Sequence, residues 1–134
     1  MKNIGINNQY IRESLKHSDF DEKSLNALID DTNPQVALEV TLSFQQNIQN
    51  SQKIIDKALL EQDIDSIWKA IHKISGTAEL VGYTRFGRYS RQLSHKIKDI
   101  PQLESHADDI RDYLNRVKSV ENNIHVGLLA LYKK

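Results

Sequence analysis

The sequence predicts an all-α protein: an up-down antiparallel four-helix bundle with one or two short additional N-terminal helices. Apolar residues recur with the 3.6-residue period of an amphipathic helix along most of the chain, and the two-residue alternation of strands is nearly absent. Two prolines and five glycines are too few for the many turns of a β-sandwich or barrel. Short connections between long amphipathic helices favour antiparallel neighbours.

The N-terminal part predicts two short helices. The first is expected over about residues 7–16, and the second is expected to start after Asp19 or Asp21. The apolar residues expected to anchor the second helix are Phe20, Leu25, Leu28 and Ile29.

The first long helix has a clear start signal, with Asn33 as N-cap and Pro34 at the first helical position. The pair Asn50 and Ser51 marks a candidate break in this helix. Its apolar stripe consists of Val36, Val40, Phe44, Ile48, Ile55, Leu59 and Leu60.

Three further helices are expected. Asp63 or Asp65 can cap a helix that ends near Gly82, Thr84 can cap one that reaches about residue 98, and Pro101 marks the next break. The last helix is expected from about residue 103. The inner faces of the final two helices are expected to carry Phe86, Tyr89, Leu93, Ile97, Ile110, Leu114, Val117, Val120 and Ile124.

Length and composition bound the class of protein. The 134 residues are expected to form a single domain, 1–134, large enough to bury a core. The absence of cysteine excludes disulfides, thiolate zinc sites and thiol nucleophiles, and it fits a reducing compartment.

Charge and hydropathy favour a protein without nucleic-acid or membrane partners. The 18 basic residues balance the 18 acidic ones, so no global field attracts nucleic acid or an anionic membrane. No apolar run approaches the ~20 residues that span a bilayer, and the N-terminus lacks a signal-peptide pattern. We expect a cytoplasmic protein without membrane insertion. The initial Met suggests a complete chain, although an excised domain with an added Met has the same appearance.

One stretch, IWKAIHKISGTAELVGY at residues 67–83, places a histidine on a helix that is otherwise strongly amphipathic. At about 100° per residue, His72 lies about 135° from the centre of the apolar seam. Its helical neighbours are Trp68, Lys69, Ser75 and Gly76. The imidazole is therefore expected in solvent, and Trp68 is expected at the edge of the core or on a docking platform. The seam consists of Ile64, Ile67, Ile71, Ile74, Ala78 and Val81.

Gly76 is unexpected in the middle of a helix, where glycine costs about 1 kcal/mol relative to alanine. Beside an exposed His72, it suggests that another molecule's backbone approaches the ring. A close helix–helix crossing would also explain the glycine, and a surface histidine can be mere decoration.

The segment AIHKISGTAELVGYTRFGRYSRQL resembles the signature of histidine-containing phosphotransfer (HPt) domains, the four-helix modules of two-component phosphorelays. That pattern is roughly His-x-Leu/Ile-Lys-Gly-Ser/Ala-Ala-x-x-x-Gly, followed by apolar residues at helical spacing. The resemblance covers about residues 20–124. The residues in register are His72, Ile74, Gly76, Thr77, Ala78 and Gly82, followed by Phe86, Tyr89 and Leu93.

The resemblance implies that His72 accepts a phosphoryl group from a receiver-domain phospho-aspartate and relays it to another response-regulator receiver. An exposed imidazole suits this role because it is mostly neutral near pH 7 and has a nucleophilic ring nitrogen. The implied protein is a relay intermediate rather than a turnover enzyme, with no ATP site. It needs no metal or cofactor of its own, since the receiver supplies Mg²⁺. The implied partners are response-regulator receivers and a hybrid sensor histidine kinase, and the chain is expected to be a monomer.

The receiver is expected to dock on the surface around His72. The segment from Arg85 to Lys98 is locally basic and could steer an acidic receiver, or it could simply balance acidic helices elsewhere. The residues expected on this surface are Trp68, Lys69, Lys73, Ser75, Gly76, Glu79, Arg85 and Arg88.

Two positions depart from the family pattern. Ser75 stands where the family usually has a lysine beside the phosphoryl group, and Ser94 stands where an acidic residue often occurs. We expect the Ser75 hydroxyl to donate a hydrogen bond and Lys69 to supply the cation, with Lys73 less well aimed. An exposed ion pair contributes at most about 1 kcal/mol, so losing the lysine should slow transfer several-fold without abolishing it.

Three other interpretations remain open at this point. An HPt-like bundle could bind a receiver or a histidine kinase without carrying phosphate, as an adaptor or inhibitor. A plain helical interaction module could carry the motif by chance. A helical metal or redox protein is disfavoured because the five histidines lie on separate segments without ligand spacing.

Overall fold

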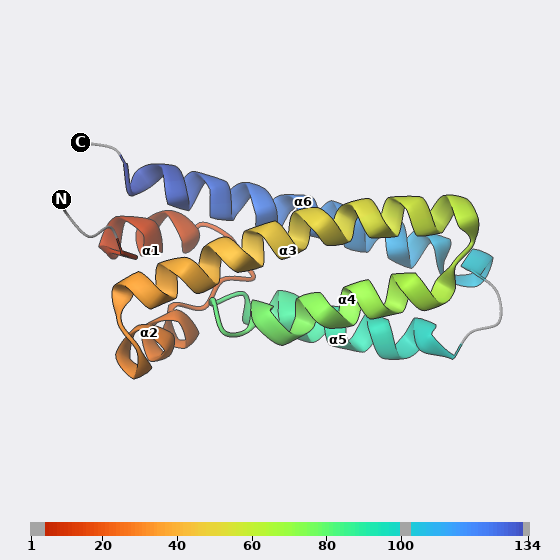
Figure 1. Ribbon diagram of the computed structural model, residues 1–134, viewed down its shortest axis with the longest axis horizontal. Coiled ribbons are helices and arrows are strands. Elements are labelled where there is room, and N and C mark those ends of the chain that lie inside the picture. The colour runs from red at the N-terminus through yellow and green to blue at the C-terminus, as the bar shows by residue number, and fades with distance from the viewer. Residues whose placement is uncertain (1–4, 100–102, 133–134) are drawn as a thin grey trace.

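The computed structural model describes residues 5–99 and 103–132, and within these ranges every regular element is helical (Figure 1). This confirms the predicted all-α class. The helices are α1 (Asn8–Ser14), α2 (Glu22–Asp31), α3 (Pro34–Glu61), α4 (Ile64–Ala78), α5 (Thr84–Lys98), the 3₁₀ turn η1 (Leu103–His106) and α6 (Ala107–Ala130). The break predicted at Pro101 lies outside the described residues.

The four long helices α3 to α6 form the predicted up-down bundle, and α1 and α2 are the additional N-terminal helices. The α4–α5 hairpin forms the most extensive helix pair and packs through α4 onto α3. Helix α1 packs on the C-terminal part of α6, and α2 lies beside the first half of α3 (Figure 1). Helix α3 thus contacts α2 with its first half and α4 of the α4–α5 hairpin along the rest of its length.

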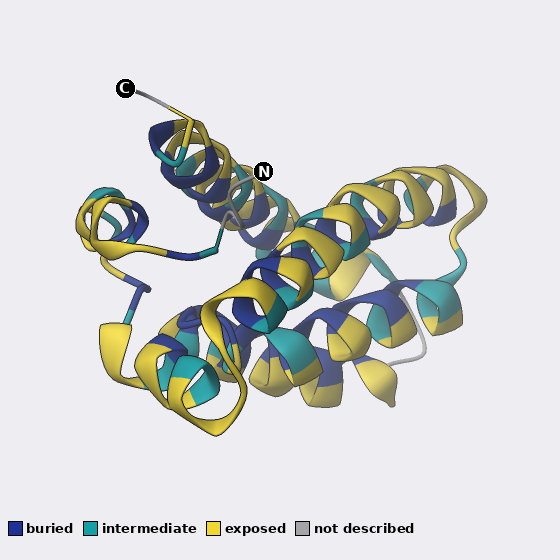
Figure 2. Ribbon diagram, turned by 60° about the vertical axis from the view of Figure 1, so that its left-hand side comes forward, coloured by how far each residue is buried: buried dark blue, intermediate teal, exposed yellow. Residues whose placement is uncertain are grey.

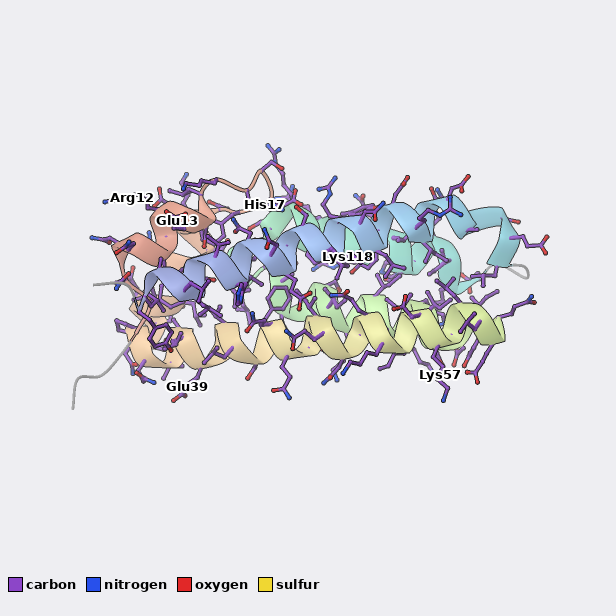
Figure 3. The ribbon with its side chains drawn as sticks, turned by 90° about the horizontal axis from the view of Figure 1, so that it is seen from above. Arg12, Glu13, His17, Glu39, Lys57 and Lys118 are labelled. Atoms are coloured by element: carbon purple, nitrogen blue, oxygen red, sulfur yellow. The ribbon has the colours of Figure 1, made fainter. Side chains whose placement is uncertain are left out.

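Helix α3 begins as predicted. The Asn33 side chain accepts a hydrogen bond from the Val36 amide at 2.9 Å, and Pro34 occupies the first turn. The break predicted near Asn50 is wrong, because the helix continues to Glu61 and buries Ile48 and Ile55 on one face. Figure 3 shows this continuity, with Glu39 and Lys57 near opposite ends of one helix.

The N-terminal helices begin close to the predicted positions, and the structure shows their caps. The Asn7 side chain accepts hydrogen bonds from the first-turn amides of α1, and Asp21 caps α2 by accepting one from the Lys23 amide. Helix α1 ends at Ser14, slightly before the predicted residue 16.

The α4–α5 connection differs from the prediction at both ends. Asp63 caps α4 as expected, but α4 ends at Ala78, and Gly82 adopts a φ of 101° in the connecting turn. Tyr83, rather than Thr84, occupies the N-cap position of α5, without a side-chain cap hydrogen bond. The Thr84 hydroxyl instead lies 3.1 Å from the Ser24 hydroxyl of α2.

The N-terminal segment holds this turn in place. The Asp21 amide donates a hydrogen bond to the Gly82 carbonyl at 2.5 Å. The Phe20 ring lies 5.3 Å from the Tyr83 ring in an edge-to-face arrangement. A Cβ atom at Gly82 would come within 2.5 Å of Phe20, so this position requires glycine for both space and backbone conformation.

The core lies between the inner faces of the helices, while their outer faces are exposed (Figure 2). Most predicted core residues are buried, including Phe86, Ile97, Val117 and all of the α4 seam except Ile64, which is half-buried. The prediction that Leu60 belongs to the apolar stripe is wrong. Its side chain is 87% exposed, because it lies at the end of α3 where no described element covers it. Tyr89 is only partly buried and packs against the Tyr113 ring. No helix within the described ranges is both long and apolar enough to cross a membrane.

Candidate functional site

His72 lies on the outer face of α4, and its side chain is exposed as predicted. The opposite face of the helix is completely buried at Ile67, Ile71 and Ile74. Because these apolar residues fix the rotation of α4 about its axis, the imidazole is held toward solvent. Among the described residues, no group forms a hydrogen bond with its ring nitrogens.

A second histidine faces His72 from the neighbouring helix. The ring of His95 on α5 lies 6.4 Å from the His72 ring, centroid to centroid, with an interplanar angle of 82°. His95 is also exposed. The sequence interpretation placed the histidines on separate segments and missed this pair. The pairing could have been found from the hairpin, because the two positions lie about equally far from the turn at Tyr83.

Trp68 forms one side of the site. Its ring lies 6.5 Å from the His72 ring, and its indole N–H donates to the Asp65 carboxylate at 3.0 Å. The Lys98 ammonium group on α5 lies 5.0 Å from the indole centroid, within the range of a cation–π contact. Trp68 is partly buried, so it both edges the core and presents a ring beside His72.

The cation expected from Lys69 is already engaged. Its ammonium group lies 2.7 Å from the Asp65 carboxylate, and both side chains are exposed. This hydrogen bond raises the pKa of Lys69 and lowers the pKa of Asp65. The structure therefore gives Lys69 a carboxylate partner one turn back, and its expected role as the cation beside His72 stays a prediction.

Ser75 is buried and so does not lie on the expected docking surface. Its side chain is 2% exposed, and its hydroxyl donates to the His72 carbonyl at 2.6 Å. Ser94 on α5 is equally buried, and its hydroxyl donates to the Arg91 carbonyl at 2.8 Å. Both departures from the family pattern are thus buried serines whose hydroxyls donate to carbonyls of their own helices. The hydroxyl donor expected at Ser75 is engaged within α4.

Gly76 is exposed and lies one turn after His72. A Cβ atom built at this position would meet nothing within 4 Å. A close helix–helix crossing therefore does not explain this glycine. The bare backbone beside His72 is instead open to a second molecule.

Glu79 and Lys73 lie on two sides of the site. The Glu79 carboxylate accepts a hydrogen bond from Arg91 of α5 and is partly buried. Lys73 is exposed but lines a shallow groove against α3, together with Asn47 and Asn50. Neither side chain is a cation directed at the His72 ring.

Arg85 and Arg88 lie at the other end of the hairpin. They line a cavity of about 500 Å³ with Asp19, Phe20 and other residues of the α1–α2 connection. Arg88 precedes His95 by two turns, about 10 Å along the helix axis. The structure does not bring either arginine next to His72.

We call the surface formed by Trp68, His72 and Gly76 of α4 with His95 and Lys98 of α5 the histidine face. Its carboxylates are paired, Asp65 with Lys69 and Glu79 with Arg91. In the described parts of the chain, no carboxylate forms an ion pair with Lys98. The face therefore presents an ammonium group and two imidazoles beside a bare stretch of helix.

Comparison with protein families identifies the family of this chain. Residues 39–120, more than half of the chain, match the family model of the Hpt domain. The chain belongs to the Hpt domain family. The match includes all of α4 and α5, and hence the whole histidine face, while α1, α2 and the end of α6 lie outside it. Neither the curated proteins nor the solved structures contain a match to the chain.

Membership of this family connects the chain with histidine phosphotransfer in phosphorelays, and with receiver domains and kinases as the general class of partner. Within the described ranges, no three side chains of His, Asp or Glu gather as candidate metal ligands.

Proposed function

We propose that the chain is a phosphorelay intermediate in which His72 accepts a phosphoryl group from a receiver phospho-aspartate and passes it to another response-regulator receiver. The observation that carries this proposal is the exposed His72 ring beside an uncovered Gly76, within the segment matched to the Hpt family. We further propose a cytoplasmic monomer that receives phosphate from the receiver of a hybrid sensor histidine kinase.

The proposed chemistry is a reversible phosphoryl transfer between oxygen and nitrogen. A neutral His72 ring nitrogen attacks phosphorus, the N–P bond forms, and the bond from phosphorus to the aspartyl oxygen breaks. The aspartate leaves as a carboxylate with the bonding electron pair, and the other ring nitrogen releases its proton to solvent. Such transfers depend mainly on positioning and charge stabilisation, and the receiver contributes its own carboxylates and Mg²⁺.

The histidine face supports docking of an acidic receiver. The absent side chain at Gly76 lets a partner backbone come close, and Lys98 adds positive charge beside Trp68. The corrected surface omits Ser75, which is buried, and Arg85 and Arg88, which face the α1–α2 connection.

The experiment that tests this proposal is phosphoryl transfer from a phosphorylated receiver domain to the wild-type protein and to His72→Gln. We expect acid-labile, alkali-stable phosphate on the wild type and none on His72→Gln. His125→Gln is the matched control, since His125 is also an exposed helical histidine but lies on α6, where it lines a groove against α3. Labelling of His72→Gln at the wild-type level would contradict the assignment of His72.

A second candidate function is a non-transferring adaptor that binds a receiver or a histidine kinase. The buried Ser75 and the Lys69–Asp65 ion pair favour it, because they leave the usual lysine position without a free cation. Calorimetry of receiver binding, combined with the phosphate-labelling experiment above, distinguishes the two functions. Receiver binding by a wild-type protein that never acquires phosphate would support the adaptor, whereas labelling of His72 supports the relay.

A further inference from the structure

His95 of the neighbouring helix faces the proposed phosphoryl acceptor, His72. Its ring contacts the His72 ring at a centroid distance of 6.4 Å, and both rings are exposed. Two imidazoles joined by a direct hydrogen bond would approach until their nitrogens were about 3 Å apart, which requires closer centroids. The two rings are therefore not joined by a direct hydrogen bond.

The position of His95 is held by its helix. Leu93 and Ile97 flank it in sequence and are buried at 4% and 0% exposure, which fixes the outward direction of the intervening side chain. The α4–α5 pair is the most extensive helix contact of the fold. The backbone positions of His72 and His95 are thus set by the core, while both side chains are exposed.

The neighbouring cations have other partners or directions. Lys69 pairs with Asp65, Arg91 with Glu79, and Lys96 with Asp109. Lys73 lines the groove against α3, and the Lys98 ammonium group lies over the Trp68 ring. Among these groups and His95, only His95 has a direct ring contact with His72.

We propose that His95 donates a hydrogen bond to the phosphoryl group carried by His72, and so takes the role of the lysine that is absent at Ser75. This inference rests on the proposed function. A phosphoryl group presents negative charge and strong acceptor oxygens, and an imidazole has an N–H donor in its neutral form and two in its charged form. Because Ser75 is buried and bonded to its own helix, the donor comes from the neighbouring helix instead.

The test loads His72 directly with phosphoramidate, a small phosphoryl donor, so that it does not depend on finding the cognate receiver. The variants are His95→Leu, which removes the donor, and His95→Lys, which restores a cationic donor, with His125→Leu as the matched control. We expect His95→Leu to shorten the half-life of the phosphohistidine by about threefold to fivefold, in line with a partly exposed charged contact. We expect His95→Lys to recover at least half of that loss and His125→Leu to match the wild type.

A spectroscopic measurement separates this role from a structural one. In ¹⁵N-labelled wild-type protein, loading of His72 should shift the ring nitrogen resonances of His95 and leave those of His125 unchanged. Equal half-lives for the wild type and His95→Leu, or unshifted His95 resonances, would overturn the proposal. Label on His95 in the His72→Gln variant would also overturn it, since His95 would then be an acceptor.

The outcomes also separate this inference from the proposed function. If phosphoramidate labels His72 and His95 responds, but no phospho-receiver transfers phosphate, the relay is wrong while the contact stands. If receivers transfer phosphate equally well to the wild type and His95→Leu, and the half-lives also agree, the relay stands and the role of His95 is wrong.

Discussion

The contact between α1 and α6 and the histidine face differ in the surroundings of their glycines and histidines. In the first region these residues are packed against other parts of the chain, and in the second they are exposed. At the N-terminal end, a Cβ atom at Gly127 of α6 would lie 3.0 Å from the Tyr10 ring and 3.1 Å from the Ser14 hydroxyl oxygen, so the glycine admits α1. On the histidine face, a Cβ at Gly76 would touch nothing. One glycine is explained by packing within the chain, and the other requires an explanation outside it.

The histidines show the same contrast. His17, labelled in Figure 3, follows α1. It uses both ring nitrogens: Nδ1 accepts a hydrogen bond from the Asp19 amide at 3.1 Å, and Nε2 lies 2.9 Å from the Ser119 hydroxyl. His72 has ring contacts with Trp68 and His95 only, among the described residues. A side chain whose polar atoms are satisfied stabilises the fold, whereas one left open is available for chemistry.

The largest expected effect is at the contact between α1 and α6. Tyr10 is completely buried against Gly127, and burial raises the pKa of its hydroxyl to about 12. Tyr10→Ala should lower the free energy of unfolding by about 3 kcal/mol, because it removes a large core side chain. Urea denaturation measures this loss, and His72→Gln should leave the same curve unchanged. A loss below about 1 kcal/mol would show that α1 contributes little to the fold.

The next effect concerns a carboxylate that would be left without its partner. Arg116 donates to the Asp19 carboxylate at 2.6 Å, and the Asp19 side chain is 2% exposed while that of Arg116 is 44% exposed. Arg116→Met should destabilise the protein by about 1–2 kcal/mol, less than a fully buried pair because water reaches the arginine. Thermal unfolding measures it, and Lys96→Met, at a more exposed pair, is the control. Equal melting temperatures for the two variants would contradict the argument.

The two glycines give a direct comparison of the two regions. Gly76→Gln should leave the fold intact and raise helix stability by up to about 1 kcal/mol, yet slow transfer from a receiver by hindering its approach. Gly127→Ala should instead destabilise the protein, because its Cβ meets Tyr10. Melting temperature and transfer rate are measured together for both variants. Unchanged transfer in Gly76→Gln would remove the explanation offered for this glycine.

Ser75→Lys tests how far the missing lysine matters. The position is buried, so the longer side chain must reach past α5 to water and should lower stability by about 1 kcal/mol. If the lysine reaches the phosphoryl group, transfer should rise by a small factor. A fall in rate in a folded variant would show that the Ser75 hydroxyl has a further role.

The smallest expected effect is a dependence of the free energy of unfolding on pH that comes from His17. Burial lowers the pKa of His17, and the Arg116 charge acts in the same direction while Asp19 opposes them. Below the unfolded-state pKa of about 6.5, His17 is protonated in the unfolded chain but stays neutral in the folded protein until the pH reaches its lower folded-state pKa. Stability from this residue is therefore present above that pH and decreases as the pH falls toward the folded-state pKa. His17→Gln should reduce the difference in melting temperature between pH 7.5 and pH 5.5. An unchanged difference would contradict this source of pH dependence.

The sequence predicted the helices and the exposure of His72 well, because periodicity and caps such as Asn33 and Asp63 are local signals. It failed where the answer depends on two helices at once. The burial of Ser75 and the approach of His95 follow from how α4 packs against its neighbouring helices, and spacing along one helix does not contain that information. The Lys69–Asp65 ion pair is different, because it joins positions i and i+4 of α4 and could have been found from the sequence.

The turn at Gly82 has a consequence for where this domain can be cut. Phe20 and Asp21 hold the turn from one side, and the Tyr83 hydroxyl donates to Asn123 at 2.5 Å on the other. All three partners lie outside residues 39–120. The stretch shared with the family is thus smaller than the unit that sets the register of the α4–α5 hairpin. A fragment that keeps the two histidines at their present separation should begin before Phe20 and end after Asn123.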